Sequence, residues 1–162
     1  MKKSLLSQIA TQIETELGSL RAAAAAAHDA ATHAENKPEN KYDTRGLEAS
    51  YLAGAQEARV LQLQSALELL RSTVPRIFRS EDAVDLTAVV ELSSDDTSCW
   101  YFLIQVAGGY LLQIASEGIQ AQVVTVTPQT PLGRALKGKR TGDEIVVRTD
   151  KGEKVYELVR IL

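Results

Sequence analysis

The stretch Glu35-Asn36-Lys37-Pro38-Glu39-Asn40-Lys41-Tyr42-Asp43 separates two long runs of helix-forming residues. One run extends from roughly Leu5 to Ala34, and the other extends from about Thr44 to Ser72. Pro38 has no backbone N–H and disfavours helix at the residue before it, so a continuous helix is not expected here. The sequence therefore predicts a helical hairpin whose tip, residues 35–43, carries three carboxylates: Glu35, Glu39 and Asp43.

Both runs carry apolar residues at alternating steps of four and three. In the first run these are Leu6, Ala10, Ile13, Leu17, Leu20, Ala24, Ala27, Ala31 and Ala34. In the second run they are Leu47, Tyr51, Gly54, Ala58 and Leu61, and then, after a slip of phase, Leu63, Leu67, Leu70 and Val74. This spacing is that of a coiled-coil seam. We interpret the slip as a widening of the stripe at the base of the hairpin, and Gly46 and Gly54 as sites of close helix approach.

A run of heptads is also compatible with a coiled coil that merely dimerises. The similar lengths of the two runs and their short connection favour an antiparallel pair within one chain instead. We therefore expect a first domain over residues 1–74, with the tip at 35–43, and a second domain over residues 75–162.

The second half of the chain is predicted to be rich in strands. Pro75 ends the second helix, and short alternating or β-branched runs follow. They predict strands at about 84–92, 99–106, 110–115, 122–127, 144–149 and 154–161. Thr130 is a candidate N-cap and Pro131 a first-turn residue of one short helix that Gly138 closes. The expected fold class is α+β, a helical hairpin followed by a small antiparallel sheet with one helix.

Composition excludes several classes of function. The net charge of −3 argues against a dedicated DNA-binding protein. The apolar run at the N-terminus is interrupted too soon for a signal peptide or a membrane span, so a cytoplasmic protein is expected. Cys99 is interpreted as part of a core strand, the two histidines are poorly spaced for a zinc site, and Gly108-Gly109 is interpreted as a hairpin turn. No metal is expected in the free protein.

The last 38 residues of the chain resemble a known family. The motif begins Thr125-Val126-Thr127-Pro128-Gln129-Thr130-Pro131-Leu132-Gly133-Arg134-Ala135-Leu136-Lys137-Gly138-Lys139, continues with Gly142-Asp143-Glu144, and closes with Tyr156-Glu157-Leu158-Val159-Arg160-Ile161. It is similar to the signature of bacterial Gre-type transcript-cleavage factors, the GreA/GreB-like family. Glu39-Asn40-Lys41-Tyr42 also resembles the acidic motif that these factors carry at their hairpin tip, with one residue fewer before the tyrosine.

The resemblance implies an accessory factor, not itself an enzyme, that acts on the active site of RNA polymerase. It implies a C-terminal domain of the FK506-binding-protein-like type that docks on the core polymerase, and a hairpin that enters the secondary channel. There the tip carboxylates would share the active-site Mg²⁺ and stimulate cleavage of the 3′ end of the nascent RNA in backtracked complexes. Glu39, with Glu35 or Asp43, is expected to act in cleavage. Residues expected to bind the partner are Asn40, Tyr42, Pro131, Leu132, Arg134, Lys137, Lys139 and Arg140.

One residue of the predicted hairpin tip, where the catalytic carboxylates are expected, departs from the family pattern. Asn36 occupies the position of the family's tip aspartate. Two actions on the polymerase therefore compete: cleavage, which is the family default, and occupation of the channel without cleavage. A third hypothesis, from another class, is a coiled-coil scaffold or peptide-binding protein. For prolyl isomerase activity no site is visible in the sequence.

Overall fold

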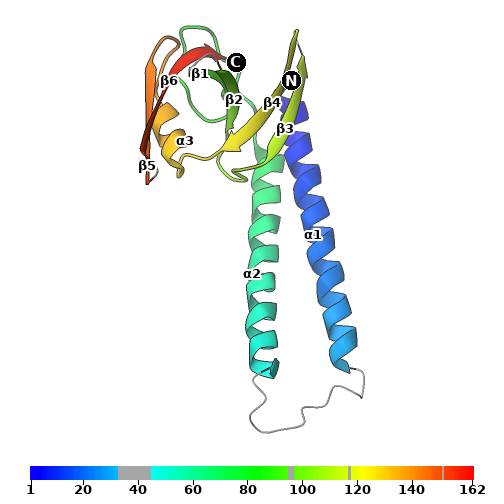
Figure 1. Cartoon of the computed structure of the whole chain (residues 1–162). Coiled ribbons are helices and arrows are strands. Elements are labelled where there is room, and N and C mark those ends of the chain that lie inside the picture. Colours follow the sequence, from blue (N-terminus) through cyan, green and yellow to red (C-terminus); the bar gives the residue numbers. More distant parts are fainter. Residues whose placement is uncertain (33–44, 95–96, 117, 151) are drawn as a thin grey trace. The chain divides into compact units, whose positions relative to one another are not determined.

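Two long helices make up most of the first half of the chain. The structure, a computed structural model, describes residues 1–32, 45–94, 97–116, 118–150 and 152–162. Helix α1 spans Lys2–Thr32 and helix α2 spans Arg45–Ser72 (Figure 1). Both predicted helices are confirmed, and the ends expected at Ala34 and Thr44 lie outside the described residues.

Two ion pairs link α1 and α2 in the described residues. Arg59 Nη2 lies 2.7 Å from Glu16 Oε1, and Arg71 Nη2 lies 2.8 Å from Glu14 Oε1. The later residue of α2 pairs with the earlier residue of α1, as antiparallel helices require. Each of these partly exposed pairs contributes about 1 kcal/mol or less. The predicted antiparallel hairpin is confirmed for the described residues.

The buried seam of α1 is shorter than the sequence predicts. Ile13 is fully buried and Leu17 is nearly so, whereas Ala24 and Ala27 are exposed. A methyl group reaches far less of a neighbouring helix than a leucine or isoleucine side chain does. Ala24 and Ala27 therefore keep the seam spacing without being covered, and their prediction as members of a buried coiled-coil seam is wrong.

The seam of α2 keeps a single phase. Gln56, Val60, Leu63, Leu67 and Leu70 are buried or half-buried and follow alternating steps of four and three, and Gln64 and Ala66 beside them are also half-buried. The predicted members Gly54, Ala58 and Leu61 are exposed, Leu61 by 59%. A Cβ atom added at Gly54 would meet nothing within 4 Å, so close helix approach does not explain that glycine. The predicted slip of phase is wrong. The polar residue Gln56 occupies a half-buried seam position, so a search for apolar residues alone assigned the wrong phase to this part of α2.

Six strands form one sheet in the second half. They are β1 (Val89–Ser94), β2 (Thr97–Leu103), β3 (Leu111–Ser116), β4 (Ile119–Val126), β5 (Glu144–Thr149) and β6 (Gly152–Ile161). The order across the sheet is β3-β4-β2-β1-β6-β5. All neighbours are antiparallel except β2 and β4, which run parallel. The expectation of a purely antiparallel sheet is wrong at this one pair, because the β3–β4 hairpin places β4 beside β2 and leaves β3 at the edge.

The short helix α3 (Pro131–Leu136) lies over one face of this sheet. Buried residues of that face include Val90, Leu92 and Leu158, and Leu136 of α3 is fully buried in the same cluster. Phe78 and Val84, from the segment between α2 and β1, complete it. The predicted α+β class with one short helix is confirmed.

The start of α1 belongs with the sheet. The chain divides into two compact units, one of Met1–Ile9 with Ser72–Leu162 and the other of Ala10–Arg71. Gln8 Nε2 donates to the Gln113 carbonyl at 2.9 Å, and the Gln113 N–H donates to Gln8 Oε1 at 2.9 Å. The glutamine amide thus pairs with edge strand β3 as a neighbouring strand would. Leu5 and Ile9 are buried in this unit, and so are Val89, Phe102, Leu112, Ile114 and Val123 of the sheet, which lie outside the core cluster that includes Leu136 of α3.

Two smaller sequence predictions are wrong. Cys99 lies in β2 but is exposed, because it sits near the open end of the strand, whereas Phe102 and Leu103 further along are fully buried. Gly108-Gly109 is not a hairpin turn, since β2 and β3 are not neighbours in the sheet. The loop is held instead by buried Thr125, whose Oγ1 donates to the Ala107 carbonyl and accepts from the Tyr110 N–H.

Within the described ranges, no helix is both long enough and apolar enough to cross a membrane.

Candidate docking surface around the short helix

The predicted site divides into two parts along the chain. Glu35, Asn36, Glu39, Asn40, Tyr42 and Asp43 lie outside the described residues. The structure describes the other part, which comprises α3 and the residues that follow it. That part is described below as the candidate site.

Local hydrogen bonds define the start of α3. Thr130 Oγ1 donates to the Thr127 carbonyl at 2.8 Å and accepts from the Gly133 N–H at 3.1 Å. Thr130 is therefore the N-cap, as predicted, and Pro131 follows where a missing N–H costs nothing. A Cβ atom on Gly133 would lie 2.0 Å from the Thr127 carbonyl oxygen. Glycine is required there, and the short helix is fixed closely against the preceding loop.

The end of α3 is tied to a segment far away in sequence. The Val84 N–H donates to the Lys139 carbonyl at 2.7 Å, and the Gly138 N–H donates to the Val84 carbonyl at 2.8 Å. The Arg140 guanidinium also donates to the Glu81 carbonyl. Gly138 adopts a φ of +82°, which permits the turn that the sequence predicted at this residue. These bonds bring the charged segment 76–85 beside the helix.

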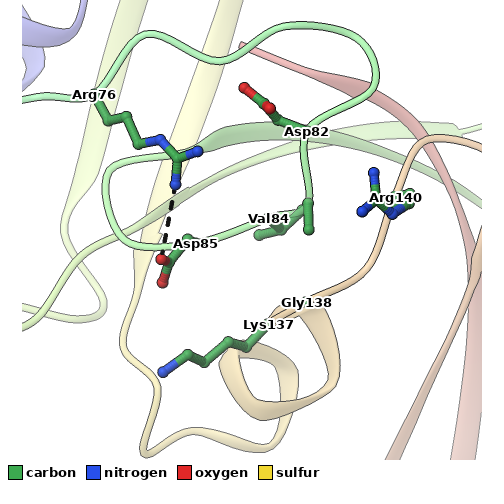
Figure 2. A pocket seen from close by; sticks show the side chains of 8 residues that line it. Arg76, Asp82, Val84, Asp85, Lys137, Gly138 and Arg140 are labelled. Atoms are coloured by element: carbon green, nitrogen blue, oxygen red, sulfur yellow. Dashed lines mark ion pairs between the residues drawn. The ribbon is translucent and has the colours of Figure 1, made fainter.

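The predicted basic cluster is divided between two hollows. Lys137 and Arg140 line a hollow of about 390 Å³ together with Arg76, Asp82 and Asp85 (Figure 2). Arg76 Nη1 lies 3.9 Å from Asp85 Oδ2, and this pair spans one side of the hollow. Three cations and two carboxylates make a surface of mixed charge with a positive excess. Such a surface fits a partner segment that has carboxylates of its own.

A second hollow lies beside the start of α3. It measures about 340 Å³ and is lined by Pro131, Arg134, Val146 and Arg148. Arg148 Nε lies 2.8 Å from Glu153 Oε2, and its hydrogen bond to that carboxylate raises the Arg148 pKa. Arg134 is exposed. The hollow therefore offers the exposed guanidinium group of Arg134, which could bind a carboxylate, beside an Arg148 guanidinium that is already paired with Glu153.

The remaining predicted residues occupy different surroundings. Lys139 Nζ donates to the Glu144 carbonyl at 2.9 Å, so its amine is already engaged at the turn before β5. Leu132 is partly buried and packs against the core. Sequence reasoning missed Arg76, Asp82, Asp85 and Arg148. Only the density of charge in residues 76–85 could have indicated the first three.

The described residues were compared with the usual requirements of a metal site. Among them, no group of three or more histidine, cysteine, aspartate or glutamate side chains is arranged to hold a metal ion. What this part of the chain offers is a rigid, partly cationic surface built on a short helix. Its chemistry is that of binding a partner.

Comparison with known proteins identifies relatives of two kinds. The transcription elongation factor GreA of Chlorobium phaeovibrioides is 30% identical over 107 residues, which cover 65% of this chain and 61% of that protein. The transcription inhibitor protein Gfh1 of Thermus thermophilus is 31% identical over 121 residues, which cover 74% of this chain and 72% of that protein. The chain thus matches less than two thirds of the length of the GreA relative and more than two thirds of Gfh1. No protein-family model matches the chain.

Solved structures of similar proteins belong to the same two kinds. The crystal structure of Gfh1 from Thermus thermophilus shares 24% identity and covers 97% of this chain and 94% of that one, with a TM-score of 0.38. GreA/GreB from Nitrosomonas europaea shares 18% identity and covers 75% and 94%, with a TM-score of 0.36. Both scores are low, so the relationship rests on the sequence matches.

Proposed function

The chain belongs to the family of Gre-type transcription factors, and from this premise we propose that it binds RNA polymerase and inserts its hairpin tip into the secondary channel. The observation that carries this proposal is the match to an inhibitor and to elongation factors of the family at about 30% identity. The long antiparallel helices, joined through the acidic stretch 35–43, supply the necessary reach. Thirty helical residues extend about 45 Å.

Docking is assigned to the surface around α3. The cations Arg134 and Lys137 are exposed on this helix and its end, and Arg76 is brought beside them by the backbone pairing of Val84. Gly133 and the Thr130 cap fix the backbone of α3, so the backbone that carries these charged side chains loses little conformational entropy on binding. A polymerase segment rich in carboxylates fits this surface.

For the action at the catalytic centre, we propose regulation by occupancy of the channel without cleavage. Asn36 stands where the family carries an aspartate, and a neutral amide is a poorer Mg²⁺ ligand than a carboxylate. A relative that is 31% identical and is matched over 72% of its length is named as a transcription inhibitor. Both observations favour a factor that blocks or slows the polymerase.

Stimulation of transcript cleavage is the second candidate. Glu39 keeps the family's glutamate, and Glu35 or Asp43 is close enough in sequence to supply another carboxylate. Other relatives are named elongation factors. If this candidate is correct, the tip would help hold a second Mg²⁺ and the attacking water, and the polymerase would provide the remaining ligands.

One assay separates the two candidates. Stalled, backtracked elongation complexes are mixed with the full chain, and shortening of the RNA and its re-extension are followed over time. Occupancy predicts no acceleration of cleavage and slower extension. Cleavage stimulation predicts faster shortening, which Glu39→Ala abolishes.

Binding to the core polymerase is measured in the same samples, so that an absence of any change in RNA shortening or extension can be distinguished from a failure to bind. Asn36→Asp is the matched variant, because it restores the family's carboxylate without changing side-chain size. Under occupancy it should raise cleavage above that of the unmodified chain. Absence of binding to core polymerase would overturn the proposal and leave the scaffold hypothesis.

A further inference from the structure

Strand β5 forms one open edge of the sheet. The strand order leaves β5 with a single neighbour, β6, and Figure 1 shows β5 at the margin of the sheet with α3 beside it. Both elements belong to the same compact unit. The centre of β5 is Ile145-Val146-Val147, a β-branched run that favours extended backbone, and the strand contains no proline. An edge of this kind can pair with another extended chain.

Two hydrogen bonds at the start of β5 show which of its backbone groups face this edge. The Asp143 carbonyl accepts a hydrogen bond from the β6 backbone at 3.0 Å, so it faces β6. The next carbonyl, that of Glu144, accepts from Lys139 Nζ at 2.9 Å and faces away from β6. Because inward and outward groups alternate along an antiparallel pair, the N–H and C=O groups of Val146 and Arg148 also face the open edge. Within the described ranges, no strand pairs with them there.

The hollow beside the start of α3 lies at the same edge. It measures about 340 Å³, and the two β5 residues that line it, Val146 and Arg148, are those whose backbone groups face outward. Pro131 and Arg134 of α3 line its other side. Arg148 is paired with Glu153, whereas Arg134 is exposed and forms no ion pair with a carboxylate of the described residues. The edge therefore combines outward-facing backbone groups with an exposed cation.

We propose that the open edge of β5 binds an extended, acidic peptide segment of another protein as an added strand. The backbone of the peptide pairs with the outward N–H and C=O groups of Val146 and Arg148. Side chains of a strand alternate between its two faces, so every second side chain of the peptide lies on the side of α3. A glutamate or aspartate at such a position accepts a charge-assisted hydrogen bond from Arg134. This interaction goes beyond the proposed function, because it requires neither the polymerase nor the hairpin tip.

The charge at the hollow favours an acidic peptide over a second copy of the chain. Two copies that pair antiparallel through β5 are related by a two-fold axis perpendicular to the joined sheet, so both copies of α3 lie on the same face. Each Arg134 lies beside its own β5 edge, so the two guanidinium groups approach each other across the axis. Like charges oppose that pairing, whereas a carboxylate in the same place is attracted.

The test uses the full chain and a short synthetic peptide of alternating valine and glutamate, blocked at both termini. Hydrogen exchange of the individual backbone amides is measured with and without saturating peptide. We expect exchange of the Val146 and Arg148 amides to slow by at least about tenfold, because the peptide covers the groups that face the edge. The amides of Ile145 and Val147 already pair with β6 and should change little.

Two matched peptides separate pairing of the backbone from attraction of charge. The first carries glutamine in place of every glutamate and should bind several-fold more weakly, because a neutral amide replaces the carboxylate. The second is N-methylated at every residue, cannot donate backbone hydrogen bonds, and should give no protection of Val146 or Arg148. Neither comparison alters the protein, so neither depends on the folding of a variant.

A pair of variants locates the carboxylate. Arg134→Gln should reduce the affinity for the glutamate peptide to that for the glutamine peptide, whereas Arg79→Gln, at an exposed position outside the hollow, should leave it unchanged. Circular dichroism confirms that both variants are folded.

Three results would overturn the proposal. They are equal affinity for the glutamate and glutamine peptides, protection that persists with the N-methylated peptide, and protection of Val146 and Arg148 that rises with protein concentration in the absence of peptide. The last result would assign the edge to a second copy of the chain. Because the polymerase is absent from these samples, a negative result here leaves the proposed function standing.

Discussion

Gly133 is the residue on which the geometry of α3 depends most directly. Its replacement by alanine would place a Cβ atom 2.0 Å from the Thr127 carbonyl oxygen, so the helix and the preceding loop must separate. We expect Gly133→Ala to destabilise the protein by about 2–3 kcal/mol, measured by urea unfolding. Gly54→Ala is the matched control, because its Cβ meets nothing within 4 Å in an exposed part of α2. It should stabilise the protein by about 1 kcal/mol.

Lys2 predicts a dependence of stability on pH. Its pKa is lowered from 10.5 to about 8 in the folded protein, so between these values the unfolded chain binds more protons than the folded one. Stability conferred by this residue therefore rises with pH across that window, and it is constant below about 8 and above about 10.5. The free energy of unfolding of the unmodified chain is compared with that of Lys2→Gln at each pH. A difference that stays flat or falls from pH 8 to 10.5 would contradict this assignment.

At the scale of elements, the β3 edge is covered by one glutamine of α1. Gln8→Ala removes both hydrogen bonds to the Gln113 backbone, and we expect a loss of about 1 kcal/mol, since these bonds are exposed. Hydrogen exchange of the Gln113 amide should accelerate several-fold. Ser7→Ala, at an exposed position on the preceding residue, serves as the control and should leave that amide unchanged. Equal exchange in both variants would show that Gln8 does not protect the edge.

The elements were predictable where their signals are local. Both long helices follow from seam spacing, and the short helix follows from the Thr130 cap, Pro131 and Gly138. The phase of the α2 seam was not predictable, because Gln56 occupies a half-buried position that an apolar pattern overlooks. The parallel pairing of β2 with β4 was missed for a different reason. The alternation of apolar and polar residues along a strand indicates which face of the strand is buried. It does not indicate which other strand is its neighbour in the sheet.

The candidate site was predicted in part for the same reason. Arg134 and Lys137 lie within the recognisable motif and were assigned from the sequence. Arg76 and Asp85 reach the same surface through the pairing of Val84 with Gly138 and Lys139 across more than 50 residues. An isolated backbone pairing of this kind leaves no periodic pattern in the sequence, so it could not be inferred.

At the scale of the whole molecule, binding and action are expected to be separable. Arg134→Glu reverses a charge in the hollow beside α3 and should weaken binding to core polymerase about tenfold at low salt, with a smaller effect as salt increases. Lys3→Glu makes the same charge change at an exposed residue outside that surface and should have little effect. Equilibrium binding of the labelled full chain is the measurement. Equal loss in both variants would point to a general effect of net charge.

The pairing of Gln8 with Gln113 has a consequence for biosynthesis. Residues 1–9 are synthesised before any of the described strands, yet they belong to the same compact unit as those strands. Leu5 and Ile9, which are buried in the folded protein, are therefore synthesised before the strands of their own unit, and the hydrogen-bond partner of Gln8 follows 105 residues later. This unit therefore cannot fold until the segments at both ends of the sequence have been synthesised. A chaperone that shields residues 1–9 until the strands have been made is expected to increase the yield of folded protein.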